Sequence, residues 1–363
     1  MTFIDTATTA KLDDVARLIS DDPQGMLAIV SRSGAQLREA LAITRACDLS
    51  AVREGGRPRA VVVAGMGGSG IAGHVLQAVA GNSCSVPVNR VRGWTLPAWV
   101  GQQDLVMLVS SSGMTGETLA CFAEARRRGC RLVVVAAAGS SLALAGQSAG
   151  ALVVSTPGPN PPRTNIWALS VPLVHVLHEL GVLDVPAWVF ASTAKLLDDI
   201  ALRCAIEIPT AQNPAKQLAA DLVGYLPMIW GSTELGGIAA YRVMCQLAEN
   251  AKLPAVNGVL PEALHNQIVT FEGAESAGLP LRLLMLVDPD EHPRVRRARE
   301  AAVAVAAERG VEMSEVWADP GHPLERLAHL VGLTDLATVY VALAMGVNPT
   351  PITPIDQLKR ATV

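Results

Sequence analysis

Hydrophobic positions along the chain form two kinds of pattern, and each predicts a different kind of element. Residues 1 to about 55 carry apolar side chains at helical spacing, and this stretch ends at a polar segment over residues 53–59. From Ala60 onward, short continuous runs of Val, Leu and Ala alternate with longer segments of helical spacing. Continuous apolar runs are typical of strands that are buried on both faces of a parallel sheet. The pattern therefore predicts an N-terminal helical segment followed by an α/β architecture.

Apolar runs that predict strands recur in both halves of the chain, each followed by a loop or a helical segment. These runs cover about residues 60–64, 86–91, 105–110, 131–137 and 151–154 in the first half, and 225–230, 281–287 and 311–317 in the second. A length of 363 residues fits two domains at roughly 150 residues each. We predict two doubly wound parallel-sheet domains. The predicted parts are an N-terminal helical segment (1–57), a first domain (58–190), a second domain (191–346) and a C-terminal segment (347–363).

Net charge and composition exclude several classes of partner. Lys and Arg number 29 against 33 Asp and Glu, so the formal charge of -4 gives no general attraction to nucleic acid or to an anionic membrane. No apolar run approaches the ~20 residues of a membrane helix, and the N-terminus lacks the pattern of a signal peptide. The six cysteines lack metal-binding spacing, and no carboxylate–histidine cluster occurs in the sequence. We expect a cytoplasmic protein with reduced thiols and no metal site.

A glycine-rich loop follows the first predicted strand. Residues 65–70 read Gly-Met-Gly-Gly-Ser-Gly, which matches the GxGxxG pattern of dinucleotide-binding folds. Those folds place an acidic residue about 20 positions later to hold the ribose, but no Asp or Glu occurs between Gly55 and Gln103. NAD is therefore disfavoured, whereas Arg90 and Arg92 leave NADP as an alternative. A turn in which the glycines only permit close packing is a further alternative.

A second loop, rich in hydroxyl groups, follows the next strong strand. Residues 110–118 read Ser-Ser-Ser-Gly-Met-Thr-Gly-Glu-Thr and lead into a predicted helix. Hydroxyls and backbone N–H groups at a helix N-terminus can bind a phosphate group without a metal ion or a lysine. The candidate phosphate-binding residues are Gly67, Gly68, Ser69, Ser110, Ser112 and Thr115. An ordinary capping loop with Thr115 as the N-cap residue is the structural alternative.

With both loops on one predicted sheet, the chain resembles the sugar isomerase (SIS) domain. Its downstream segments resemble the bifunctional phosphoglucose/phosphomannose isomerases of prokaryotes, from about Arg57 to Lys359. The segments that carry the resemblance are GMGGSGIAG, SSSGMTGET, PGPNPPR, AENAKLPA, EALHNQIV and GVNPTPITPIDQLKR. The resemblance implies two flavodoxin-like SIS domains. It also implies an enzyme that interconverts glucose 6-phosphate and fructose 6-phosphate, and mannose 6-phosphate as well, through a cis-enediol(ate) intermediate without metal or cofactor.

The resemblance assigns roles to individual residues. Glu249 matches the family's catalytic base, and His265 matches the histidine that opens the sugar ring. In the family this histidine reaches the active site of the partner subunit, so a homodimer is implied. Arg163 follows a proline-rich segment and would place a permanent cation beside the developing enediolate oxygen. On spacing alone, Glu249 could instead be a surface residue that pairs with Lys252 three positions later.

The C-terminal segment carries the remaining candidates. Lys359, Thr350 and Thr353 lie where the family folds its chain back over the site, and one threonine there admits the mannose epimer. The departures from the family pattern are Ser111 for a tyrosine, Met114, Ala248 and Leu264 for asparagines, Gly116 and Gln267 for glutamates, and Asn348 for an aspartate. These departures leave open an isomerase for another phosphosugar. The further alternatives are a non-catalytic phosphosugar-binding or regulatory protein and an NADP-dependent oxidoreductase.

Overall fold

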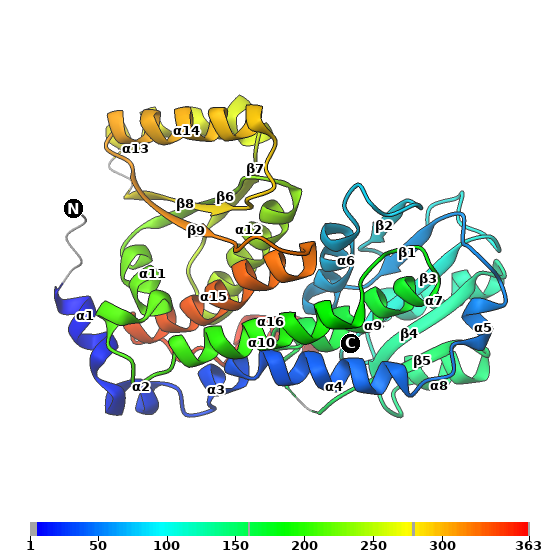
Figure 1. Ribbon diagram of the computed structural model, residues 1–363. Helices are drawn as coiled ribbons and strands as arrows, with labels where there is room; N and C mark the ends of the chain where they lie inside the picture. The colour runs from blue at the N-terminus through cyan, green and yellow to red at the C-terminus, as the bar shows by residue number, and fades with distance from the viewer. Residues whose placement is uncertain (1–5, 159, 278–279, 362–363) are drawn as a thin grey trace. The chain divides into compact units, whose positions relative to one another are not determined.

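Packing divides the protein into two compact units, each with its own parallel sheet (Figure 1). The computed structural model describes residues 6–158, 160–277 and 280–361. One unit, the five-stranded unit, comprises Ser33–Lys195 and His322–Glu325. The other, the four-stranded unit, comprises the chain up to Arg32, Leu196–Gly321 and the chain from Arg326. Both units contain helices and parallel strands, which confirms the predicted α/β class.

The N-terminal segment is helical, as its hydrophobic spacing predicts. Its helices are α1 (Thr6–Asp13), α2 (Val15–Asp21), α3 (Met26–Ser31), α4 (Ser33–Arg45) and α5 (Ser50–Arg53). Asp14 caps α2 by accepting the Arg17 N–H at 3.0 Å. Such a carboxylate pairs an N–H group that has no acceptor within the helix, and its charge suits the positive end of the helix dipole. This helical segment divides between the two units at Arg32, so the compact units do not follow contiguous chain boundaries.

The five-stranded sheet has the order β2-β1-β3-β4-β5, with all strands parallel. Its strands are β1 (Val61–Ala64), β2 (Val88–Val91), β3 (Leu105–Ser110), β4 (Arg131–Ala137) and β5 (Leu152–Thr156). The helical elements between and after them are α6 (Gly67–Ala80), α7 (Gly116–Arg127), α8 (Ser141–Ser148), η1 (Pro162–Thr164) and α9 (Ile166–Glu179). Strand β1 lies between β2 and β3, so the chain order reverses there. The loops after β1 and β3 therefore meet at the carboxyl edge, where ligands bind in folds of this class.

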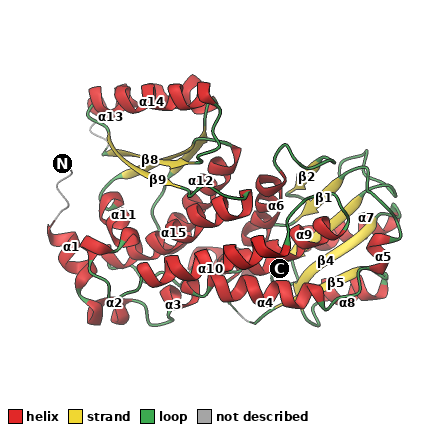
Figure 2. Ribbon diagram, in the orientation of Figure 1, coloured by secondary structure: helices red, strands yellow, loops and turns green. Residues whose placement is uncertain are grey.

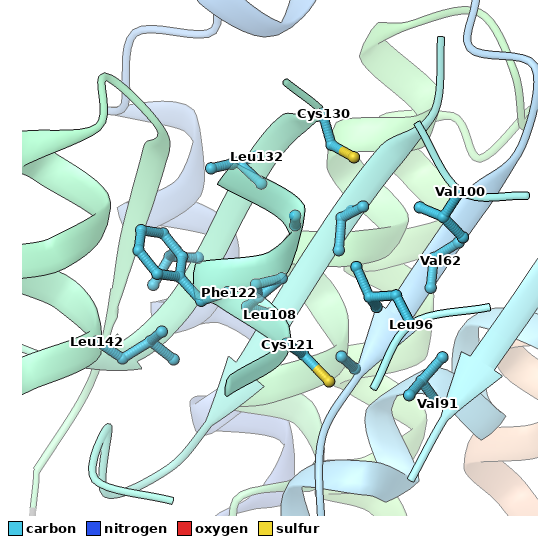
Figure 3. Packing of buried hydrophobic residues seen from close by; sticks show 14 of the residues in the cluster. Val62, Val91, Leu96, Val100, Leu108, Cys121, Phe122, Cys130, Leu132 and Leu142 are labelled. Carbon is cyan, nitrogen blue, oxygen red and sulfur yellow. The ribbon is translucent and has the colours of Figure 1, made fainter. Parts of the chain in front are cut away.

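An aliphatic core lies between this sheet and α7 and α8 (Figure 3). Val62 and Leu108 of the strands share this core with Phe122 of α7 and Leu142 of α8. On the other face, α6 approaches Val63, whose side chain alternates in direction with that of Val62. Helices α6 and α9 pack together, and α9 contacts β3, β4 and β5. Burial on both faces explains why the strands read as continuous apolar runs.

The four-stranded sheet has the order β7-β6-β8-β9 and is also parallel. The elements after α9 are α10 (Ala187–Arg203), η2 (Thr210–Gln212), α11 (Pro214–Leu222), β6 (Leu226–Gly231), α12 (Glu234–Gln246), η3 (Leu247–Ala251), β7 (Val256–Val259), η4 (Glu262–His265), η5 (Gln267–Val269), α13 (Thr270–Ala277), β8 (Leu281–Val287), α14 (Pro293–Glu308), β9 (Glu312–Trp317), α15 (Pro323–Ala344) and α16 (Thr353–Ala361). Figure 2 shows α14 over one face of this sheet and α12 on the other. Ala302 and Ala306 of α14 pack with Phe271 and the inward-facing residues of β6 and β8.

Helix α15 is long and apolar enough, by length and composition, to cross a membrane. Within the protein, 89% of its most apolar stretch is buried. Its Asp335 carboxylate accepts from Arg242 of α12 at 2.6–3.1 Å, and both residues are at most 4% exposed. These features are typical of a core helix, because the apolar surface and the buried charge are both covered by protein.

His74, in the second turn of α6, is a buried titratable group close to the glycine-rich turn. Its ring Nδ1 lies 3.1 Å from the Gly70 carbonyl oxygen, and the residue is 6% exposed. Burial, with a smaller contribution from the nearby Arg90 and Arg92 charges, lowers the pKa of His74 from 6.5 to about 4. His74 is therefore neutral in the folded protein at neutral pH.

This lowered pKa predicts a loss of stability in mild acid. Between pH 6.5 and pH 4 the unfolded chain binds a proton at this histidine and the folded chain does not, so the free energy of unfolding falls as pH falls. The contribution of His74 to that fall is about 3 kcal/mol over the whole window. His74→Gln removes this contribution, and urea unfolding at pH 7.0 and pH 4.5 measures it. If the mutant and the parent lost equal stability between these pH values, His74 would not titrate as stated.

Candidate functional site

A hydrogen bond joins the two loops that the sequence singles out. The Ser111 N–H, in the loop after β3, donates to the Ser69 hydroxyl in the first turn of α6 at 2.9 Å. Ser69 is 6% exposed, so this contact is buried within the carboxyl edge of the five-stranded sheet. The sequence places these loops 42 residues apart. The structure thus brings together the two candidate phosphate-binding segments.

The loop between β3 and α7 is held in shape by its own hydroxyl groups. The Ser110 Oγ accepts the Gly113 N–H at 3.0 Å and lies 2.9 Å from the Thr115 Oγ1. Ser110 is fully buried, whereas Ser112 is exposed and Thr115 half-buried. Gly113 adopts a φ of +64°, and a Cβ atom there would lie 1.9 Å from the Ser140 Oγ. Only glycine fits this turn, which directs the chain into α7.

Thr115 occupies the N-cap position of α7, but its side chain makes no capping hydrogen bond. Its hydroxyl pairs with Ser110 instead, so the N–H groups in the first turn of α7 have no hydroxyl cap from Thr115. The Ser69 and Ser112 hydroxyls each accept a backbone N–H, from Ser111 and Met114. A serine that accepts in this way keeps its own O–H proton for a further acceptor. The loop therefore offers hydroxyl and N–H donors to an anion.

The segment that carries Arg163 packs directly against the glycine-rich turn. A Cβ atom on Gly68 would lie 3.0 Å from the carbonyl carbon and oxygen of Pro162 and 3.2 Å from the Arg163 nitrogen. A glycine at position 68 thus permits this close approach of two backbones. Arg163 lies in η1 and is 4% exposed. The structure therefore brings the third predicted segment to the same edge of the five-stranded sheet.

Gln36 of α4 holds the Arg163 segment in place through three hydrogen bonds. Its Nε2 donates to the Thr164 carbonyl at 3.0 Å, and its Oε1 accepts the N–H groups of Trp167 and Ala168 at 3.0 and 3.1 Å. These two N–H groups belong to the first turn of α9, so a side chain distant in sequence caps that helix. The buried Gln36 amide holds the backbone next to Arg163 in place. The sequence pattern gives no signal for this role.

Cationic side chains line α6 close to its N-terminal end. The Cδ of Arg92 lies 3.8 Å from the Cβ position of Gly70, and the Cγ of Arg90 lies 3.2 Å from that of Gly73. From the sequence alone, these arginines have a predicted role only in the alternative in which the ligand is NADP. They lie beside the helix whose N-terminus the glycine-rich turn forms, so their charges favour an anion at that end.

Trp94 is a further residue that the sequence pattern does not reveal. It is 62% exposed, and its indole lies 3.0 Å from the Cβ position of Gly116, at the start of α7. A glutamate at position 116, as in the family pattern, would meet this ring. The Trp94 and Gly116 pair therefore gives the loop an aromatic rim in place of an acidic side chain.

Glu249 lies in the four-stranded unit, where α12 changes to a π-helical turn. This turn, η3, contains Glu249 at a half-buried position and Asn250 at a buried one. The Asn250 Nδ2 donates to the Thr338 Oγ1 of α15 at 3.1 Å, and this bond fixes the turn. Single π-helical turns are frequent at functional sites.

Lys252 ends this turn in a left-handed conformation, with φ of +57°. Its Nζ lies 2.9 and 3.1 Å from the carbonyl oxygens of Glu249 and Asn250, and 3.1 and 3.3 Å from those of Asn348 and Pro349. Lys252 thus joins the Glu249 turn to the C-terminal segment. The structure thus gives this lysine backbone carbonyl partners, which its i+3 spacing from Glu249 does not predict.

His265 is exposed at the end of η4, after β7. The loop beneath it is fixed by Gln267, whose Oε1 accepts the Trp230 Nε1–H at 2.6 Å and whose Nε2 donates to the Asn257 carbonyl at 3.0 Å. An amide makes both bonds, whereas the glutamate of the family pattern can only accept when ionised. The Gln267 departure therefore has a structural reason within this loop.

The C-terminal candidates lie at different depths. Thr350 is half-buried, and its N–H donates to the Asn348 Oδ1 at 3.0 Å. The Asn348 Nδ2 donates to the Gln24 Oε1 at 3.0 Å, a bond that the aspartate of the family pattern could not donate. Thr353 and Lys359 are exposed at the two ends of α16. Within the four-stranded unit, Lys252 therefore links Glu249 to the segment just before Thr350.

Within the part of the chain that the structure describes, no group of three or more His, Cys, Asp or Glu side chains could hold a metal ion. Among the described residues, none of the six cysteines forms a disulfide bond.

Comparisons with known proteins identify relatives that are named as phosphoglucose isomerases. Residues 211–361 match the family model described as the bacterial phospho-glucose isomerase C-terminal SIS domain. A bifunctional phosphoglucose/phosphomannose isomerase of Caldicellulosiruptor bescii is 31% identical over 301 residues, which cover 82% of this chain and 88% of that protein. The enzyme of the same name from Aquifex aeolicus is 30% identical over 302 residues, 83% of this chain and 89% of that protein.

A solved structure supports the fold. The crystal structure of a hypothetical protein from Thermus thermophilus superposes with a TM-score of 0.73 at 17% identity, and covers 97% of this chain and 93% of that one. The likeness at this identity concerns the fold. Together with the sequence relatives, it shows that the resemblance extends over both units. The chain belongs to the bifunctional phosphoglucose/phosphomannose isomerase family.

Proposed function

We propose that this protein is an aldose–ketose isomerase that interconverts glucose 6-phosphate and fructose 6-phosphate, and mannose 6-phosphate as well. The observation that carries the proposal is the meeting of the glycine-rich turn, the hydroxyl loop and the Arg163 segment at one edge of the five-stranded sheet. The named activity of the relatives in the same family supports it. The proposed place of action is the cytoplasm.

The phosphate group is held by the helix ends of the five-stranded unit. Gly67, Gly68, Ser69, Ser112 and Thr115 supply N–H and hydroxyl donors, and the dipoles of α6 and α7 favour the negative charge. Donors that are already oriented cost little reorganisation when the anion binds. Ser110 contributes through Thr115, because its own hydroxyl is buried beneath the loop.

The reaction moves a proton between C1 and C2 of the open-chain sugar. Glu249 removes the proton from one carbon, and the carbonyl oxygen gains charge as the cis-enediol(ate) forms. Arg163 stabilises that charge, a proton passes from the hydroxyl of the neighbouring carbon to the former carbonyl oxygen, and Glu249 returns the carbon-bound proton to that neighbouring carbon. His265 transfers the proton needed to open the ring, a role that suits an imidazole near neutral pH. Lys359 and Thr350 or Thr353 complete the site from the C-terminal segment.

Chain topology supports a site that is completed by a partner subunit. Helix α12 starts at the carboxyl edge of the four-stranded sheet and runs back, so Glu249 lies toward the amino edge. Strand β7 then returns to the carboxyl edge, and His265 follows it. A four-residue strand spans roughly 10 Å. Strand β7 thus separates the two residues along the chain, and we propose that the acting histidine is His265 of the partner subunit in a homodimer, as in the family that the chain resembles.

The first prediction concerns the base. The purified protein converts fructose 6-phosphate to glucose 6-phosphate in a coupled assay, and Glu249→Gln lowers kcat by about 10²–10⁴-fold with little change in KM, because a proton transfer is lost and not a binding contact. Glu308→Gln, which changes an exposed carboxylate on α14, is the matched control and keeps full activity. Equal activity in the parent and the Glu249 variant would refute the assignment of the base. Mannose 6-phosphate in the same assay tests the second epimer.

The second prediction concerns the shared site. Glu249→Gln and His265→Asn are each inactive as homodimers, and mixing with subunit exchange restores about one quarter of the parental activity. Half of the dimers in such a mixture contain one subunit of each kind, and one of their two sites then has both an intact Glu249 and an intact partner histidine. If both residues acted within one subunit, no site in the mixture would be complete and activity would stay at background.

A further inference from the structure

Asn165 has a buried side-chain amide in which only the nitrogen, Nδ2, makes a hydrogen bond among the described residues. It lies at the N-cap position of α9, two residues after Arg163, and is 2% exposed. Its Nδ2 donates to the Ser111 Oγ at 3.0 Å. Its Oδ1 is buried and has no hydrogen-bond partner among the described residues. An acceptor left unsatisfied in this way costs about 1–3 kcal/mol, so it needs an explanation.

The ordinary partners of this oxygen are occupied by another residue. An asparagine at an N-cap position accepts the second or third N–H of its helix with Oδ1. In α9 those groups are the N–H groups of Trp167 and Ala168, and both donate to the Gln36 Oε1. Gln36 therefore performs the capping that Asn165 would otherwise provide. The fold thus leaves Asn165 Oδ1 without the bond that its position normally supplies.

The location of Asn165 connects it to the candidate phosphate site. Its amide is one hydrogen bond from Ser111, and the Ser111 N–H bonds to Ser69. Ser111 is half-buried and stands where the family pattern has a tyrosine. The hydroxymethyl side chain is much smaller than a phenol ring, so a serine here leaves room beside the loop that a tyrosine would fill. The Nδ2 bond to the Ser111 Oγ stays intact, and the Oδ1 is the atom of the amide that remains for a molecule held by the loop.

We infer that Asn165 is a specificity-determining residue that accepts a hydrogen bond from a hydroxyl group of the bound sugar through its Oδ1. An amide oxygen needs a hydrogen-bond donor, so a sugar hydroxyl suits it and a phosphate oxygen does not. A phosphate oxygen at neutral pH is an acceptor and cannot satisfy another acceptor, whereas a sugar hydroxyl donates. The Nδ2 bond to Ser111 fixes the direction of the amide. This inference rests on the proposed phosphosugar function and adds the part of the site that distinguishes sugar from phosphate.

The experiment compares two ligands by calorimetry on the intact protein, so it does not depend on turnover. Asn165→Ala is expected to weaken binding of fructose 6-phosphate about tenfold, the effect of one lost hydrogen bond, and to change inorganic phosphate binding less than about twofold. Thr164→Val is the control. It removes the bond that the Thr164 Oγ1 donates to the Pro161 carbonyl at 2.9 Å in the same segment but leaves Asn165 and Gln36 unchanged, so it weakens both ligands by the same factor.

The outcomes separate this inference from the proposed function. If the parent binds fructose 6-phosphate and Asn165→Ala weakens both ligands equally, as Thr164→Val does, the residue is only structural and the inference is wrong. If the parent binds inorganic phosphate but gains nothing from the sugar, the proposed function and the inference both fail. Thermal unfolding of each variant confirms that the folded protein is compared.

Discussion

The Ser69–Ser111 hydrogen bond ties together the parts of the five-stranded unit that a phosphosugar would contact. A doubly wound sheet brings the loops after β1 and β3 to one edge, but it does not by itself fix the distance between them. The buried bond at 2.9 Å does so, and the close approach of Gly68 to Pro162 adds the third segment. The first contact needs the Ser69 hydroxyl, and the second needs a glycine, because a Cβ atom at position 68 would meet the Pro162 backbone. The hydroxyl donors and Arg163 depend on this arrangement for their relative positions.

Local charge replaces net charge in this protein. With a formal charge of -4, the chain has no general attraction for a sugar phosphate. The positive ends of α6 and α7, the buried Arg163 and the arginines beside α6 supply a positive potential where the anion would bind. The same two arginines help to keep His74 neutral. The site therefore combines fixed positive charge with His74, a histidine that carries no proton charge at neutral pH.

The sequence predicts the parallel-sheet architecture and both loops because each depends on local pattern. Continuous valine runs reveal strands buried on both faces, and short motifs of glycine and serine reveal the turns. Other features depend on contacts between distant residues. Gln36 caps α9, which begins far along the chain at Ile166, so no local pattern in the sequence reveals that Asn165 is left without its capping bond. The i+3 spacing of Glu249 and Lys252 likewise does not reveal the left-handed turn that brings the lysine ammonium group to backbone carbonyl oxygens. The short strand β7, with Asn257 and Gly258 in its four residues, also lacks the pattern of a buried strand.

The most direct test of the proton-transfer account is the fate of solvent hydrogen. Fructose 6-phosphate is converted in D₂O, and nuclear magnetic resonance then measures deuterium at C2 of the glucose 6-phosphate formed. A carboxylate base that holds the proton between two carbons exchanges part of it with solvent, so the account predicts measurable deuterium at C2 and none formed by Glu249→Gln. Product that carries no deuterium, or the same deuterium content and rate with the Glu249 variant, would contradict a cis-enediol(ate) reaction at Glu249.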